Sequence, residues 1–145
     1  MYTITEIEDA IISTLKGSTM NSYCKKIDSY QIEGGDLEEQ IRLFSGQLPC
    51  VLVVYKEGTF DYFLAGGEYK EMKFSILVCA QNMRGSGEAR RSVIGTYQML
   101  DDLRVALTGN ACGLSIHPLS AIIEVAEINT KMFSAYSMEF LTRVF

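Results

Sequence analysis

The feature that most constrains the fold is a series of β-rich segments joined by very short connections in the middle of the chain. Residues 51–55 are apolar and rich in β-branched side chains, as expected of a strand covered on both faces. Glu57-Gly58 and Gly66-Gly67 then offer turns, and both connections are too short for a crossover between parallel strands. The segment therefore predicts an antiparallel meander. Its predicted strands are 51–55, 60–64 and 70–81.

Three other segments carry apolar side chains at the three- and four-residue spacing of an amphipathic helix. The first has two possible capping boxes, Thr3 with Glu6 or Thr5 with Glu8, and Gly17 is a natural stop. The first predicted helix runs from one of these caps to Gly17, and the other two predicted helical segments are 36–46 and 88–108. Two more strands are predicted at 122–128 and 136–144, and residues 23–32 suggest a half-exposed strand or an extended loop.

Length and composition indicate one folded domain. The 145 residues fit the usual domain size, and 48% hydrophobic with 21% charged residues is typical of a globular chain. With no linker or repeat in view, we predict a single α+β domain over residues 1–145. It would contain a mainly antiparallel sheet with about three helices packed against it.

Charge and hydropathy limit the classes of ligand and the cellular location that we expect for this chain. A net charge of −5 argues against free nucleic acid as a principal ligand, because such binders usually carry a basic surface. The apolar runs are too short to span a bilayer, and no signal region opens the chain. We therefore expect a soluble, cytoplasmic protein with no membrane partner.

The sequence offers no convincing site for metal, cofactor or catalysis. The four cysteines are scattered, with no C-x-x-C pair and only His117 to complete a zinc site, so we expect buried thiols and neither metal nor cofactor. The paired carboxylates Glu38-Glu39 and Asp101-Asp102 are adjacent on predicted helices, so each pair points about 100° apart. No nucleophile elbow is present, and we expect no enzyme, with an activity based on His117 as the weaker alternative.

A basic cluster stands out in this acidic chain. Arg84, Arg90 and Arg91 surround the start of a predicted helix, where cations oppose the helix dipole and need acidic partners. Intrachain ion pairs or simple exposure are one interpretation, and a contact between subunits is another. The alternative function is a small nucleotide- or nucleic-acid-binding module that uses this loop together with Gly85 and Gly87, although the full glycine-rich motif is absent.

The residues from 82 to 119 form a recognisable pattern. It consists of Asn82-Met83-Arg84-Gly85, Glu88-Ala89-Arg90-Arg91, Gly95-x-Tyr97-x-x-Leu100-x-Asp102-x-Arg104-x-x-Leu107-x-Gly109, Gly113-Leu114 and Pro118-Leu119. This pattern resembles the Mu-like prophage tail terminator family. The opening helix and the Leu48-Pro49-x-Val51 segment are also similar to that family, so the resemblance covers most of the chain.

The resemblance implies a structural protein of the virion tail. Such proteins form a ring, expected to be a homohexamer, that stops polymerisation of the tail tube and presents the surface to which the head docks. The implied partners are the tube protein, the sheath protein and a head-completion protein, while DNA passes through the lumen without specific binding. No catalytic residue is implied. The source could equally be an infectious phage, a defective prophage or a headless contractile particle.

Two segments are candidates for contacts with neighbouring subunits, because unpaired strand edges can accept a strand from another chain. One is the predicted turn at Glu57 and Gly58. The other is the terminal segment 136–145, in which Tyr136 and Met138 are the named candidates. Together with the three arginines, these residues form the predicted interface with neighbouring subunits or with the tube. We also expect the acidic balance to keep the lumen from gripping DNA, because like charges repel.

Overall fold

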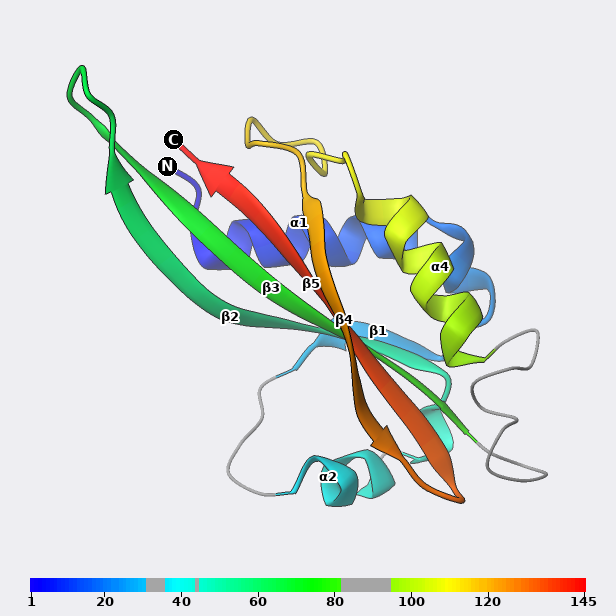
Figure 1. Ribbon diagram of the computed structural model, residues 1–145. Coiled ribbons are helices and arrows are strands. Elements are labelled where there is room, and N and C mark those ends of the chain that lie inside the picture. The colour runs from blue at the N-terminus through cyan, green and yellow to red at the C-terminus, as the bar shows by residue number, and fades with distance from the viewer. Residues whose placement is uncertain (31–35, 44, 82–94) are drawn as a thin grey trace.

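A five-stranded sheet organises the residues that the structure, a computed structural model, describes: 1–30, 36–43, 45–81 and 95–145. The strand order is β1-β2-β3-β5-β4 (Figure 1). Only β1 and β2 run parallel, and every other neighbouring pair is antiparallel. The strands are β1 (Lys26–Ser29), β2 (Cys50–Tyr62), β3 (Glu68–Gln81), β4 (Ser120–Asn129) and β5 (Phe133–Val144). The predicted α+β class with a mainly antiparallel sheet is confirmed.

Three α-helices accompany the sheet in the described residues: α1 (Ile4–Lys16), α2 (Leu37–Leu43) and α4 (Thr96–Leu107). Two short 3₁₀ helices, η1 (Thr19–Ser22) and η2 (Ser45–Gln47), join them to the strands. At the start of α1, the Glu6 N–H donates to Thr3 Oγ1 at 3.1 Å and the Thr3 N–H donates to Glu6 Oε2 at 2.6 Å. The first of the two capping boxes is therefore the one that forms.

The described part of the helix predicted over 88–108 is α4, which begins at Thr96. Gly95, with φ −95° and ψ 173°, is extended and caps α4, so no helix can run through it. The part of the prediction that falls on residues 82–94 lies outside the described residues. From Thr96 onward the predicted apolar stripe is confirmed at Leu100, Leu103 and Leu107, which are buried, but not at Tyr97, which is 45% exposed.

Glu57-Gly58 is not a turn, and this prediction was wrong. The strands predicted at 51–55 and 60–64 are one strand, β2, with a bulge between Tyr55 and Glu57. A Cβ on Gly58 would lie 2.3 Å from the Tyr55 hydroxyl, so this glycine permits a close approach inside the strand rather than a reversal. The reversal is at Gly66 and Gly67, whose φ angles of +87° and +104° favour glycine.

The two faces of the sheet are covered differently (Figure 1). Helices α1 and α4 lie on one face, called here the helix face, where the larger hydrophobic cluster contains Ile7, Phe74, Leu103 and Phe140. Helix α2 covers only part of the opposite face, over a smaller cluster around Leu52 and other residues of β2, β3 and β5. The remaining opposite face carries charged side chains. Its ion pairs are Lys56–Glu139, Lys73–Glu57 and Arg143–Glu71.

Candidate protein interaction surfaces

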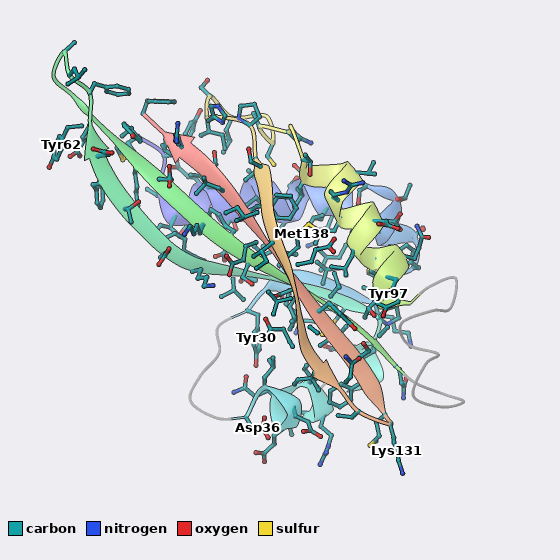
Figure 2. The ribbon with its side chains drawn as sticks, viewed as in Figure 1. Tyr30, Asp36, Tyr62, Tyr97, Lys131 and Met138 are labelled. Carbon is teal, nitrogen blue, oxygen red and sulfur yellow. The ribbon has the colours of Figure 1, made fainter. Side chains whose placement is uncertain are left out.

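The β2–β3 hairpin presents an apolar tip that projects beyond the helices (Figures 1 and 2). Tyr62 is 71% exposed, Leu64 is fully exposed, and Phe60 and Phe63 are also exposed. Scattered apolar side chains are ordinary on a protein surface, but a cluster on one projecting element is typical of a contact site. We call Phe60, Tyr62, Phe63 and Leu64 the hairpin tip.

The base of the hairpin tip is held against the C-terminal residue of the sequence. The ring of Phe63 lies 5.0 Å from the Tyr69 ring and 5.7 Å from the Phe145 ring, measured between centroids. The Arg143 guanidinium lies 5.6 Å from the Tyr69 centroid, and its Nε donates to Glu71 Oε2 at 3.0 Å. These contacts hold the tip in a defined position, which reduces the entropy lost when it binds a partner.

Strand β4 forms a second apolar surface at one edge of the sheet. Within the described residues it pairs only with β5, so its outer backbone groups have no strand beside them. Ile122 and Ile123 are 47% and 49% exposed, and Val125 is exposed as well. An exposed apolar edge strand is a natural site for another chain, because it offers both hydrogen bonds and apolar contact.

The terminal strand does not have the free edge that was expected of segment 136–145. Strand β5 pairs with β3 on one side and β4 on the other, so it cannot accept a further strand, and that prediction was wrong. Met138 is buried in the helix-face core, and Tyr136 is half-buried with its ring 5.7 Å from that of Tyr97. Sequence reasoning placed the right strand here but could not tell that β4 would lie outside it.

The other predicted interface residues are widely separated or lie outside the described residues. Glu57 is exposed on the opposite face, where its carboxylate pairs with Lys73 at 2.9 Å, and this partner lowers the pKa of Glu57. Gly58 lies in the bulged part of β2. Arg84, Arg90 and Arg91, with Gly85 and Gly87, lie outside the described residues, so their role stays a prediction.

His117 and Asp102 both have structural partners. The His117 N–H donates to the Arg143 carbonyl at 3.0 Å, and Thr142 Oγ1 donates to the His117 carbonyl at 2.5 Å, which ties this loop to β5. Asp102 accepts hydrogen bonds from the Tyr23 hydroxyl at 2.6 Å and from Gln98 Nε2 at 2.8 Å. Asp102 is therefore not simply a solvated charge, because it links α4 to the turn after η1. Burial, together with the hydrogen bond to Asp102, raises the pKa of Tyr23.

Among the described residues no group of three or more His, Cys, Asp or Glu side chains could hold a metal ion. The four cysteines are free thiols, and Cys50 and Cys79 lie directly opposite each other on β2 and β3. A hydrogen bond with the Cys50 thiol, together with burial, raises the pKa of Cys79, which keeps this thiol protonated. No helix in this part of the chain is long and apolar enough to cross a membrane.

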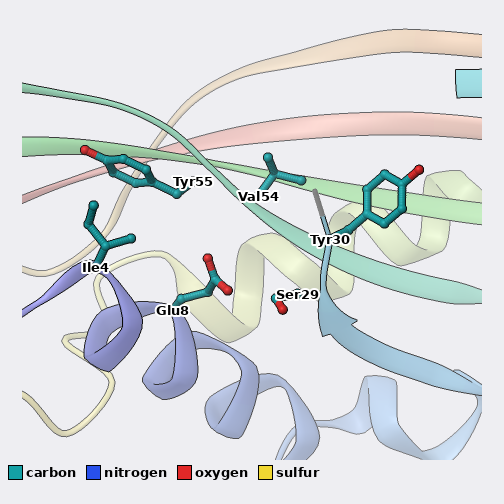
Figure 3. A pocket seen from close by; sticks show the side chains of 6 residues that line it. All are labelled: Ile4, Glu8, Ser29, Tyr30, Val54 and Tyr55. Atoms are coloured by element: carbon teal, nitrogen blue, oxygen red, sulfur yellow. The ribbon is translucent and has the colours of Figure 1, made fainter. Parts of the chain in front are cut away.

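A pocket of about 300 Å³ opens between α1 and the start of the sheet (Figure 3). The side chains that line it are Ile4, Glu8, Ser29, Tyr30, Val54 and Tyr55. The carboxyl group of Glu8 lies among these side chains, and it accepts a hydrogen bond from Ser29. Burial raises the pKa of Glu8, and the nearby Asp9 and Asp28 add to this, while the bond from Ser29 opposes it.

The raised pKa of Glu8 predicts a pH-dependent stability difference. A carboxyl whose folded pKa lies above its unfolded value, near 4.5, stabilises the fold at low pH and loses this contribution as it ionises. In Glu8→Gln the group stays neutral. We expect the unfolding free energy of the variant, relative to wild type, to increase between about pH 4 and about pH 7. Urea unfolding at both pH values measures it, and a constant difference would contradict the burial argument.

The comparisons with known proteins place these surfaces in a phage protein. The profile of the family described as "Bacteriophage Mu, Gp37" matches residues 3–145. The chain belongs to this family. Membership of the Bacteriophage Mu Gp37 family confirms that the Mu-like resemblance identified a phage protein family, and it covers α1, the whole sheet and both apolar surfaces. No curated protein matches the chain.

Proposed function

We propose that this member of the Bacteriophage Mu Gp37 family is a structural subunit that caps the end of a phage or phage-derived tail tube. It forms a ring, a hexamer by the resemblance noted above, that stops tube polymerisation and presents the surface for the head. It acts by assembly rather than by chemistry. Its partners are further copies of itself, the tube protein, the sheath protein and a head-completion protein, and DNA passes through without specific binding.

The observation that carries this proposal is the pair of apolar surfaces, the hairpin tip and β4, on separate parts of one domain of a phage protein family. A ring subunit that also binds a tube needs contacts to its neighbours and a separate contact to the tube. The edge strand suits association between like subunits, because strand pairing repeats from copy to copy. The projecting tip suits a partner outside the ring, because apolar aromatic anchors contribute much of the binding energy at interfaces.

Deletion of the gene from the phage or prophage that encodes the chain tests the capping function. We expect lysates of the deletion strain to contain tails of widely scattered and increased length, without attached heads, because nothing stops tube growth. Electron microscopy of negatively stained particles gives the length distribution. The wild-type chain supplied from a plasmid should restore a narrow distribution.

Tails of normal, uniform length in the deletion strain would overturn the capping proposal. The alternative, a module that binds nucleotide or nucleic acid through the loop at Arg84, Arg90 and Arg91, makes a different prediction. Tight binding of DNA or ATP to the purified chain at physiological salt, lost in Arg90→Ala with Arg91→Ala, would support that alternative.

A further inference from the structure

We infer that copies of this chain associate head to tail by pairing β4 of one copy with the free edge of β2 in the next. The sheet then continues from copy to copy around the assembly. This inference deepens the proposed function, since it names the contact that would build the ring. It concerns the chain alone, however, and can be tested without tube or head.

The sheet has two free edges in the part of the chain that the structure describes. On one side β4 has only β5 as a neighbour. On the other side β1 pairs only with Cys50–Val53 of β2, and the Tyr30 N–H donates to the Val53 carbonyl at 2.9 Å. Beyond that point β2 continues to Tyr62 with no described strand outside it, as its separated end in Figure 1 shows. Each edge therefore offers a row of backbone donors and acceptors.

The directions of the strands allow these two edges to meet as an antiparallel pair. β2 is antiparallel to β3, β3 to β5, and β5 to β4, so β2 and β4 point in opposite directions. If the next copy keeps the same face of the sheet toward the same side, its β2 lies antiparallel to β4 of the first copy. Antiparallel strands form a more stable hydrogen-bonded ladder than parallel strands. In this arrangement the helix faces of the two copies also form one continuous surface.

Charges on the helix face distinguish this head-to-tail pairing from a symmetric one. Glu124 lies opposite the buried Met138 in the register of β4 and β5, and Lys70 lies opposite the buried Val144, so both charges belong to the helix face. Neither forms an ion pair with a described residue. Lys70 Nζ instead lies 5.4 Å from the ring centroid of Phe60, on the strand at the free edge.

Head-to-tail pairing brings the acidic β4 edge toward this lysine. A symmetric pairing of β4 with β4 would instead bring Glu124 and Glu127 of one copy toward the same residues of the other. Like charges on opposed strands destabilise the pair, whereas opposite charges stabilise it. The partner on this edge is therefore a second copy in the head-to-tail arrangement.

Cross-linking of the purified full chain tests the pairing. Thr59 and Val125 are exposed, and both lie on the opposite face of the sheet, one on each free edge. In Thr59→Cys with Val125→Cys, a flexible bis-maleimide should link neighbouring copies into a ladder of dimers, trimers and larger species. Wild type carries the same four native cysteines and controls for reaction at those thiols. Both single variants should give no ladder.

Each outcome decides the question. A ladder that appears in the double cysteine variant and in neither single variant supports head-to-tail pairing. Adding Glu124→Lys to the double variant should reduce the ladder, and adding Lys70→Glu as well should restore it. Dimers from Val125→Cys alone would show symmetric β4 pairing and overturn the inference, as would the absence of a ladder at high protein concentration. If the double cysteine variant gives a ladder but the deletion strain makes normal tails, the strand pairing stands and the capping proposal is rejected. Failure of the pairing and failure of the capping proposal can therefore be distinguished.

Discussion

Replacement of Tyr62 and Leu64 by serine is expected to abolish the restoration of normal tail length while leaving the fold intact. Both side chains belong to the hairpin tip and are exposed, 71% and fully, so they contribute little to the stability of the free chain. Changes at such positions usually alter stability by no more than about 0.5 kcal/mol each. At an interface, in contrast, the loss of apolar anchors removes most of the binding energy, about 2 kcal/mol or more for each important residue.

The measurement is the tail-length distribution in the deletion strain supplied with the variant, together with thermal unfolding of the purified protein. A matched control is Leu43→Ser with Val105→Ser, which removes two apolar side chains that are 83% and 81% exposed on α2 and α4. We expect this control to restore normal tails. If the tip variant also restores them, the hairpin tip is not the contact with the tube.

Phe74→Ala is expected to destabilise the chain by about 3–5 kcal/mol, the usual range for truncation of a buried phenylalanine. Phe74 is fully buried in β3, pairs in register with Phe140 of β5, and packs edge-on against Tyr55 with 5.5 Å between centroids. Its removal leaves a cavity in the cluster that it shares with Ile7 and Ile11 of α1, and we expect the surrounding strands to fill this space only in part. Urea unfolding followed by circular dichroism measures the loss.

Phe74→Leu is the matched control, because it keeps most of the volume and should cost no more than about 1.5 kcal/mol. A loss below about 1 kcal/mol in the alanine variant would mean that this part of the sheet repacks freely, which is not the behaviour of a well-packed core. Such a loss would also weaken the case for a rigid hairpin, since β3 carries both Phe74 and the tip-supporting Tyr69.

The candidate surfaces could be predicted only in part. We predicted interface residues at a turn and at a terminal strand, because strand ends and turns are common contact sites: Glu57, Gly58, Tyr136 and Met138. The first two lie inside or beside a bulge of β2, and the last two lie on β5, which is paired on both sides. The apolar run that ends in Leu64 before two glycines was a usable signal for the tip. No such local signal marks β4 as an edge, because a strand's neighbours depend on the whole topology.

The sequence alone determined the periodic elements and the fold class. The helix that begins after Thr3, the apolar stripe of Leu100, Leu103 and Leu107, and the β-rich segments all follow from local spacing and capping, which depend on residues a few positions apart. The tertiary structure decided the strand order, the bulge beside Gly58 and the two free edges. Those features depend on contacts between residues far apart in the chain, and local patterns do not contain that information.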